Sequence, residues 1–280
     1  MGYANENDIP SIASFLVNFL ECVIDENDYS IPEVETFTKS RRALGIGISN
    51  LFGFLAKENL FYNTNAAREK VHNIMEVFYY HLIKASVELA KEKGACEKFN
   101  ETRYSEGLFS FSEFRSIKGV NNHKFNLNWE YLKKEVEKYG MRHSTLMAVP
   151  PAANSADVSN STSGVEPPRE LITTKSDKNT LIKKVVPYYK ECSSYYTTAW
   201  GDDFNNIDYF KLISNISKFV DQSISLNQYT KVEKGEKINV AVILDEIIAC
   251  FNLGIKTLYY QNFNTQGEKN DGCENGACSV

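Results

Sequence analysis

Apolar residues recur every three or four positions along several stretches of the chain, the spacing that gathers them on one face of a helix. The first stretch follows Asp8, a residue suited to cap a helix, and the last covers about 237–252 and stops at Gly254. The longest runs from about 66 to 93, with Gly94 as its natural stop. The apolar stripes of the first, longest and last helices are, in turn, Ile12, Phe15, Leu16, Phe19, Leu20 and Val23; Val71, Met75, Phe78, Leu82, Ala85 and Leu89; and Val240, Ile243, Leu244, Ile247, Ile248 and Phe251.

The remaining pattern predicts further helices at about 43–58, 128–139, 179–200 and 209–220, with Pro187 breaking or kinking the third of these. Two short segments, 143–149 and 255–260, have strand character instead. Helices alternating with short strands indicate a helix-rich α/β fold.

Residues 150–169 are rich in proline and small polar residues, so no regular element spans them. They form a long loop at the end of a predicted strand, where α/β proteins usually place ligand sites. The composition alone favours a surface excursion or a linker, and both interpretations stay open.

Gly45 and Gly47 lie inside the helix predicted at 43–58 and resemble the opening of a dinucleotide-binding loop. The third glycine is missing, since Asn50 stands in its place, and no strand precedes the motif. We therefore interpret the two glycines as positions of close packing.

Composition narrows the function classes. The chain has 280 residues and a net charge of −5, enough for one large or two small domains and a poor match to a nucleic-acid partner. No stretch approaches the roughly 20 apolar residues of a membrane span, and the start lacks the layout of a secretory signal. Cysteines at 22, 96, 192 and 250 are scattered singly, and Cys22 and Cys250 fall in apolar helices where a reduced thiol packs as a small hydrophobe. These features indicate a cytoplasmic protein, and the four histidines show no metal-binding spacing.

Two features near the end of the chain carry candidate chemistry. Cys273 and Cys278 lie in a polar, glycine-containing tail, which suits either a mobile dithiol or an ordinary polar terminus. Tyr259 and Tyr260 lie in the predicted strand just upstream. The chain has 16 tyrosines and several adjacent pairs, so a pair is weak evidence by itself. Neighbouring side chains of a strand point to opposite faces, so stacking of this pair requires a local departure from the pleat.

Several segments together resemble the large subunit of class I ribonucleotide reductase, in its carboxy-terminal portion. They are RRALGIGISNLFGFLA (41–56), STLMAVPPAANSADVSNSTSGVEPPR (144–169), FVDQSISLN (219–227), KTLYYQN (256–262) and DGCENGACSV (271–280). The resemblance implies the second half of a ten-stranded α/β barrel over residues 1–262, followed by a flexible, redox-active tail at 263–280.

The resemblance also implies roles for individual residues. A loop formed by Pro151, Ala152, Ala153, Asn154 and Ser155 would bind the diphosphate of a ribonucleotide, although the two alanines replace positions that are often polar. Tyr260 would take an oxidising equivalent from the small subunit, and Tyr259 would pass it to the active-site cysteine. Cys273 and Cys278 would then re-reduce the active site by thiol–disulfide exchange.

The partners implied are a radical-generating, metal-containing small subunit, thioredoxin or glutaredoxin as reductant, and a ribonucleoside diphosphate; no cofactor is expected on this chain. The family's thiyl-radical cysteine has no convincing match here. We therefore expect one piece of a split large subunit, inactive alone and completed by an upstream chain. A non-catalytic thiol-carrier or interaction module is the alternative. The cobalamin-dependent branch of the superfamily is disfavoured by the tyrosine pair.

Overall fold

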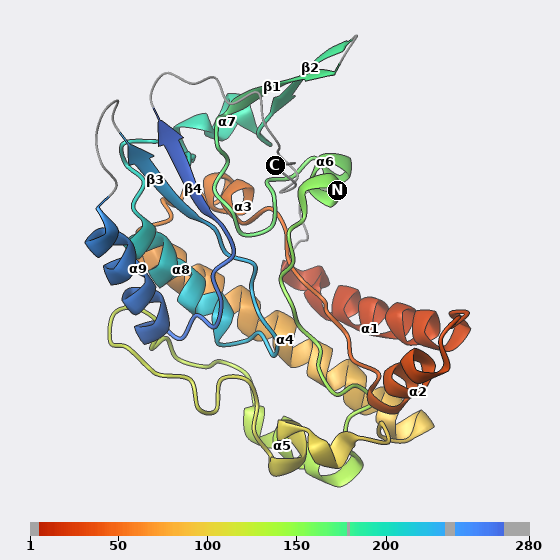
Figure 1. The fold of residues 1–280 in the computed structure, drawn as a ribbon. Helices are drawn as coiled ribbons and strands as arrows, with labels where there is room; N and C mark the ends of the chain where they lie inside the picture. The colour runs from red at the N-terminus through yellow and green to blue at the C-terminus, as the bar shows by residue number, and fades with distance from the viewer. Residues whose placement is uncertain (1–5, 178–179, 233–238, 266–280) are drawn as a thin grey trace.

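The computed structural model describes residues 6–177, 180–232 and 239–265. These residues form a helix-rich α/β structure (Figure 1). The helices are α1 (Ile9–Glu26), α2 (Pro32–Arg41), α3 (Leu51–Lys57), α4 (Asn65–Lys93), α5 (Trp129–Tyr139), α6 (Ala153–Ser159), α7 (Tyr189–Cys192), α8 (Asn206–Ser217) and α9 (Val240–Asn252). The strands are β1 (Ile172–Asp177), β2 (Thr180–Val185), β3 (Gln228–Val232) and β4 (Gln261–Thr265).

Four extended segments lie side by side in chain order and form a parallel layer: 44–48, 145–149, 222–232 and 257–265. Isolated parallel bridges join Ile46 to Met147 and Val149 to Ile224. The last two segments pair as β3 and β4, also in parallel. Among the described residues this layer is open, so the family-like α/β character is present without a closed barrel. The redox-active tail predicted at 263–280 lies almost wholly outside the described residues.

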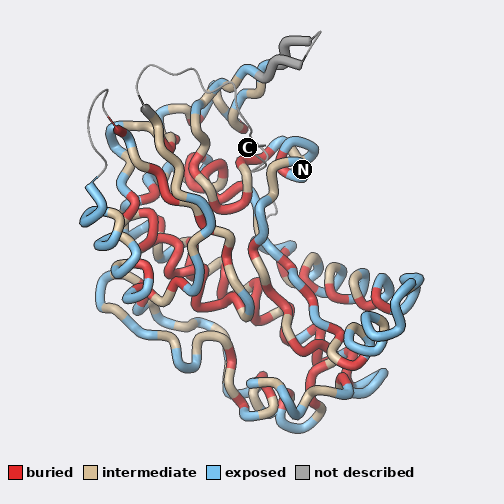
Figure 2. Tube along the Cα trace, in the orientation of Figure 1, coloured by how far each residue is buried: buried red, intermediate tan, exposed pale blue. Residues whose placement is uncertain are grey.

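The core lies between this layer and α4, which crosses the molecule beneath it (Figure 1). The predicted stripe of α4 is buried as expected, and its neighbours are α1, α5 and α8. Buried backbone follows the same path through the centre of the molecule (Figure 2). Gly94 ends α4 and Gly140 ends α5, both with positive φ, as their positions in the sequence predict.

The helix expected at 43–58 begins only at Leu51. Its first half is extended instead, because the amide of Leu44 donates to the carbonyl of Thr145 and that of Ile46 to Leu146, at 3.0 and 2.8 Å. A Cβ atom at position 47 would lie 2.6 Å from the carbonyl oxygen of Ala148, closer than real Cβ contacts come. Close packing at Gly47 is thus confirmed, while a Cβ at Gly45 would meet its nearest neighbour at an ordinary 3.5 Å.

The helix expected at 179–200 is wrong over its first part. Residues 172–177 and 180–185 pair as the antiparallel strands β1 and β2, with Ile172 opposite Val185. The β-branched run Ile172–Thr174 suits an extended backbone better than a helix. Only α7 and a short 3₁₀ turn remain of the predicted helix after Pro187. The segments 143–149 and 255–260 are extended and hydrogen-bonded, but neither forms a regular strand; β4 begins at Gln261.

Helix α1 buries a different face from the one its apolar stripe predicts. Phe15 and Phe19 are 66% and 54% exposed, and their rings stack on each other at 5.9 Å. The residues turned inward are Ile9, Ala13, Val17, Glu21 and Ile24. Cys22 is exposed on this helix, contrary to expectation, whereas Cys250 on α9 is buried as expected.

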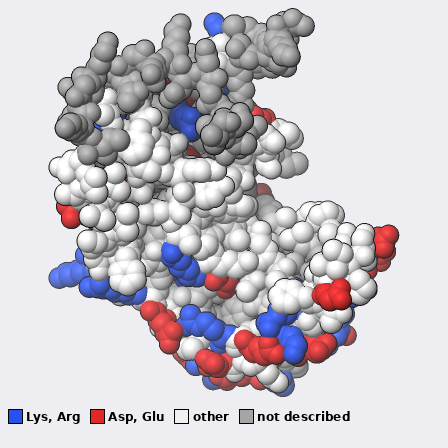
Figure 3. Space-filling view, in the orientation of Figure 1, with Lys and Arg blue, Asp and Glu red and all other residues white. Residues whose placement is uncertain are grey.

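Helix α9 repeats this arrangement, because most of its predicted stripe is exposed, including Val240, Leu244, Ile248 and Phe251. In the view of Figure 3 charged side chains gather along the lower edge, over α2 and α5, and most of the middle of that face is uncharged. Helices α1 and α9 therefore present apolar surface of the kind that marks interaction sites.

The segment from Glu6 to Glu26, which contains α1, is also long and apolar enough to span a membrane, with a mean hydropathy of 1.2 in its best window. The expectation that no stretch comes close to this length and composition is therefore wrong for this segment. Core helices of water-soluble proteins reach the same values, so the observation alone assigns no membrane.

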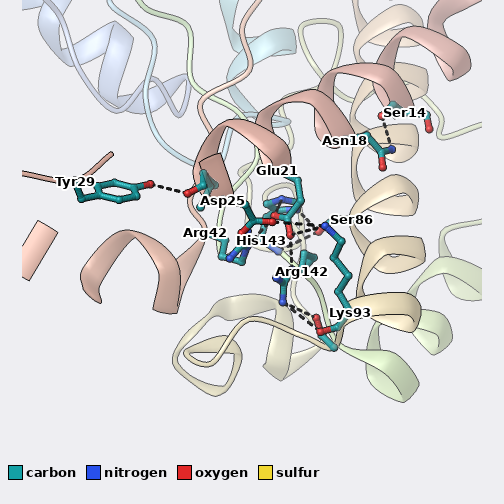
Figure 4. A network of polar contacts seen from close by, with 12 residues as sticks. Ser14, Asn18, Glu21, Asp25, Tyr29, Arg42, Ser86, Lys93, Arg142 and His143 are labelled. Carbon is teal, nitrogen blue, oxygen red and sulfur yellow. Dashed lines mark hydrogen bonds and ion pairs between the residues drawn. The ribbon is translucent and has the colours of Figure 1, made fainter. Parts of the chain in front are cut away.

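A buried polar network fastens α1 to the rest of the fold (Figure 4). The carboxylate of Glu21 accepts hydrogen bonds from Arg42 Nε and Arg142 Nε, both at 2.7 Å, and lies 3.2 Å from His143 Nε2. Ser86 of α4 lies 2.9 Å from the other ring nitrogen of His143. Burial by itself raises the pKa of Glu21, but the hydrogen bonds from His143 and the two arginines outweigh it and hold that pKa well below its usual range.

Removing the Glu21 carboxylate leaves Arg142 without its anion, and it leaves the buried Arg42 with Asp25 as its remaining partner. Glu21→Ala is expected to lower the free energy of unfolding by about 3–5 kcal/mol, the usual cost of breaking a buried ion pair. Denaturant unfolding followed by circular dichroism measures the change. Glu26→Ala, at an exposed position of the same helix, is the control and should change stability by less than about 0.5 kcal/mol. Equal effects of the two substitutions would contradict the role of the network.

The contact between Gly47 and Ala148 allows a paired test. Gly47→Ala is expected to destabilise the protein by about 1–3 kcal/mol, because the added methyl group meets backbone that belongs to the parallel layer. Gly45→Ala, two residues away, should be tolerated. Thermal unfolding of both variants checks this, and a stable Gly47→Ala protein would show that the two segments do not pack as described.

Candidate functional site

Tyr259 and Tyr260 form a close pair of mutually tilted rings at the surface of the parallel layer. Their ring centroids are 4.1 Å apart at an interplanar angle of 56°, and their hydroxyl oxygens are 3.3 Å apart. Both side chains are accessible, at 54% and 40% exposure. The two phenols are thus close enough to each other to exchange a proton and remain open to a partner.

A bulge in the backbone makes this contact between two adjacent rings possible. The Tyr259 amide donates to the carbonyl of Leu226 at 2.7 Å, and the Gln228 amide donates to the carbonyl of Tyr260 at 2.8 Å. In a parallel ladder these two bonds pair residue 226 with 258 and residue 228 with 261, so two tyrosines lie opposite the single residue Asn227. This bulge is the departure from the pleat that contact between two adjacent tyrosine rings requires.

The loop predicted after the second extended segment lies at the carboxyl end of the parallel layer. It contains α6, which begins at Ala153, and Asn154 and Ser155 are exposed in its first turn. After α6 the chain runs alongside residues 49–51. The Asn50 amide donates to the carbonyl of Thr162 at 3.0 Å, and the side-chain oxygen of Asn50 accepts from the amide of Thr162 at 2.9 Å. These contacts fix the base of the loop.

A pocket of about 180 Å³ opens between this loop, the β1–β2 hairpin and β3. Glu166 lies in its wall and accepts hydrogen bonds from the amide of Asn227 at 3.1 Å and from the hydroxyl of Tyr229. Burial raises the pKa of Glu166 to about 7, although the hydrogen bonds from Tyr229 and Asn227 act in the opposite direction. Close by, Arg169 donates to the side-chain oxygen of Asn262 at 3.3 Å.

Reasoning from the sequence did not single out Asn227, Glu166, Arg169 or Tyr229. The only signal was the pair of charged residues flanking two prolines in Glu166-Pro167-Pro168-Arg169. The structure brings this motif, at the end of the predicted substrate loop, next to the strand that pairs with the tyrosine segment. It therefore connects two features that the sequence presents separately.

The predicted dithiol, Cys273 and Cys278, lies outside the described residues. The cysteines that are described, at 22, 96, 192 and 250, are all free, and burial raises the pKa of Cys96 and that of Cys250, the latter to about 12. Thiols of this kind are poor nucleophiles near neutral pH. Within the described ranges no three His, Cys, Asp or Glu side chains are grouped closely enough to hold a metal ion.

Comparisons with known proteins agree on one family. The family model described as "Ribonucleotide reductase, barrel domain" matches residues 2–261. The ribonucleoside-diphosphate reductase subunit alpha of Buchnera aphidicola from Schizaphis graminum is 37% identical over 296 residues, covering 100% of this chain and 39% of that protein.

The ribonucleoside-diphosphate reductase 1 subunit alpha of Escherichia coli is 35% identical over 270 residues (92% of this chain, 35% of that protein). The alpha subunit of bacteriophage T4 is 33% identical over 265 residues (93% and 35%). The chain thus spans less than two fifths of the length of these relatives.

The raised pKa of Glu166 predicts a pH dependence of stability. An unfolded glutamate loses its proton near pH 4.5, whereas folded Glu166 keeps it to about pH 7. The bound proton therefore contributes at most about 3 kcal/mol to the free energy of unfolding. This contribution is fully present below pH 4.5 and is lost as the pH rises to about 7.

Denaturant unfolding of the wild type and of Glu166→Gln across this range measures the effect. The difference in unfolding free energy between the two proteins should change in the stated direction between pH 4.5 and 7 and level off above it. Glu170→Gln, at an exposed position in the same segment, serves as the control. A pH-independent difference for Glu166→Gln would show that this carboxyl group titrates normally.

Proposed function

The chain belongs to the ribonucleotide reductase barrel-domain family, and on that premise we propose that it supplies part of the catalytic barrel of a ribonucleoside-diphosphate reductase. In this role it contributes the substrate-phosphate loop, the radical-transfer tyrosines and the tail dithiol to the reduction of ribonucleotides to deoxyribonucleotides. The observation that carries the proposal is the close contact between the rings of Tyr259 and Tyr260, built at a backbone bulge and accessible from outside.

The tyrosine pair suits the transfer of an oxidising equivalent. A phenol, whose reference pKa lies near 10, can pass an electron and a proton together without holding a charge at neutral pH. The 3.3 Å separation of the two hydroxyl oxygens supports proton exchange between them. In this proposal Tyr260 receives the equivalent from a metal-containing small subunit, and Tyr259 passes it on to the thiyl-radical cysteine.

Residues Pro151–Ser155 suit an anionic ligand. The first turn of any helix leaves its leading amide groups without partners inside the helix, and the helix dipole favours negative charge there. Here that turn begins at Ala153, with the polar side chains of Asn154 and Ser155 exposed beside it. The diphosphate of a ribonucleotide is the ligand that we assign to this loop, bound mainly by main-chain amides because Ala152 and Ala153 offer no side-chain donor.

The open layer and the exposed apolar helices call for a covering partner. Segment 44–48 bonds to segment 145–149 along one edge through Leu44 and Ile46. Strand geometry directs the amides of Gly45 and Gly47 to the opposite edge, which is suited to pair with another strand. We propose that the rest of the barrel, with the catalytic cysteines, covers this edge and the Phe15–Phe19 face. Thioredoxin or glutaredoxin in the cytoplasm then supplies electrons through Cys273 and Cys278.

Conservative removal of each phenol tests the proposal. In a complex of this chain with the upstream part and the small subunit, Tyr259→Phe and Tyr260→Phe are expected to reduce deoxyribonucleotide formation to background, because phenylalanine passes no proton. The thermal midpoint should stay within a few degrees of the wild type, since both rings are partly exposed.

Tyr131→Phe, which removes an exposed phenol from α5, is the control and should leave turnover unchanged. Turnover that survives both substitutions at 259 and 260 would reject the radical-transfer role. Turnover that survives them but is lost with the double change Cys273→Ser and Cys278→Ser would favour the thiol-carrier alternative.

A further inference from the structure

The contact between the rings of Tyr259 and Tyr260 depends on a group that holds the extra residue of the bulge in place. A bulge leaves one residue unpaired in the ladder, and an unpaired backbone amide costs free energy unless another group accepts its hydrogen bond. Here the amide of Tyr260 has a specific acceptor. The side-chain oxygen of Asn227 lies 3.1 Å from it.

Asn227 is the single residue opposite the two tyrosines. It and its two neighbours in the chain all form hydrogen bonds with the pair. The carbonyl of Leu226 accepts from Tyr259, the side chain of Asn227 accepts from Tyr260, and the amide of Gln228 donates to the carbonyl of Tyr260. The side chain in the middle replaces the backbone acceptor that the ladder lacks at this point.

The position of Asn227 is itself fixed by contacts to other elements. Its amide donates to Glu166, whose second oxygen accepts from the hydroxyl of Tyr229. The backbone of Tyr229 is held in turn by Asn206 at the start of α8, which accepts from its amide at 3.1 Å and donates to its carbonyl at 2.8 Å. The bulge therefore rests on buried groups of the loop, α8 and β3.

We infer that Asn227 is a positioning residue for the tyrosine pair: its side-chain oxygen holds the backbone bulge that brings the rings of Tyr259 and Tyr260 together. The structural part of this inference rests on the hydrogen bonds alone, and the catalytic part rests on the proposed function. Asn227 acts through the backbone of Tyr260. It sets the distance between the two phenols, on which transfer between them depends steeply.

Two substitutions separate the acceptor from the rest of the side chain. Asn227→Ala removes the oxygen that binds the Tyr260 amide, whereas Asn227→Asp keeps an oxygen at that place. Gln261→Ala is the matched control, because it removes a side-chain bond from the next residue to Thr230 of β3, 2.8 Å long, without touching the bulge.

The first measurement is made on this chain by itself, with 3-fluorotyrosine incorporated at position 260. The ring current of Tyr259 displaces the ¹⁹F resonance of the residue 260 ring that lies against it. The displacement is expected to collapse in Asn227→Ala and to persist in Asn227→Asp and Gln261→Ala. An unchanged resonance in Asn227→Ala would overturn the inference, whether or not the reductase function holds.

The second measurement is turnover in the complex with the upstream part and the small subunit. Asn227→Ala is expected to lower kcat by about tenfold or more with an unchanged KM for the ribonucleotide, since misplacement of the pair by about 1 Å impairs only the transfer step. Asn227→Asp should restore most of the loss. A lost ring-current shift with normal kcat would overturn the positioning role. A wild-type complex without turnover would reject the proposed function, and the ¹⁹F result would still decide the structural claim.

Discussion

The hydrogen bonding of segment 145–149 on both of its edges is the interaction on which the rest of the structure depends. It pairs with 44–48 on one side and with 222–226 on the other, and the carboxylate of Asp221 accepts the amides of Leu146 and Met147 at 2.7 and 3.0 Å. The second oxygen of that carboxylate accepts the hydroxyls of Tyr79, Tyr104 and Ser110. One side chain thus joins the centre of the parallel layer to α4 and to the irregular region after it. The loop 150–169 follows the carboxyl end of segment 145–149, and its Glu166 accepts the amide of Asn227 in the neighbouring segment.

What the sequence predicts well is set by local physics. Helix α4 has a dense apolar stripe over many turns and a glycine at its end, so both its existence and its limit follow from periodicity. The sequence predicts close packing at Gly47 correctly but places Gly47 in a helix, because the hydrogen bonds that make its surroundings extended come from residues about a hundred positions away. The apolar stripe of α1 was recognised, yet periodicity identifies a stripe without naming what covers it. In the described part of the chain that face is open.

The candidate site likewise contains features that the sequence predicts and features that it does not. The tyrosine pair and the loop were found through a resemblance that covers nearly the whole chain, and the need for a departure from the pleat followed from strand geometry. Asn227 and Glu166 were missed, because their importance arises from contacts between segments 33 and 61 residues apart. Neither residue belongs to a recognisable motif of catalysis. Their significance depends on which segments the parallel layer places side by side.

We propose that this chain provides the radical-transfer pair and substrate loop of a reductase whose catalytic cysteine lies in the rest of the large subunit. The most direct measurement is deoxyribonucleotide formation from a ribonucleoside diphosphate in a mixture of this chain, the upstream part of the large subunit, the small subunit and a dithiol reductant, with each omitted in turn. Product is expected only from the complete mixture. Product in the absence of the upstream part, or undiminished product in the absence of this chain, would contradict the proposal.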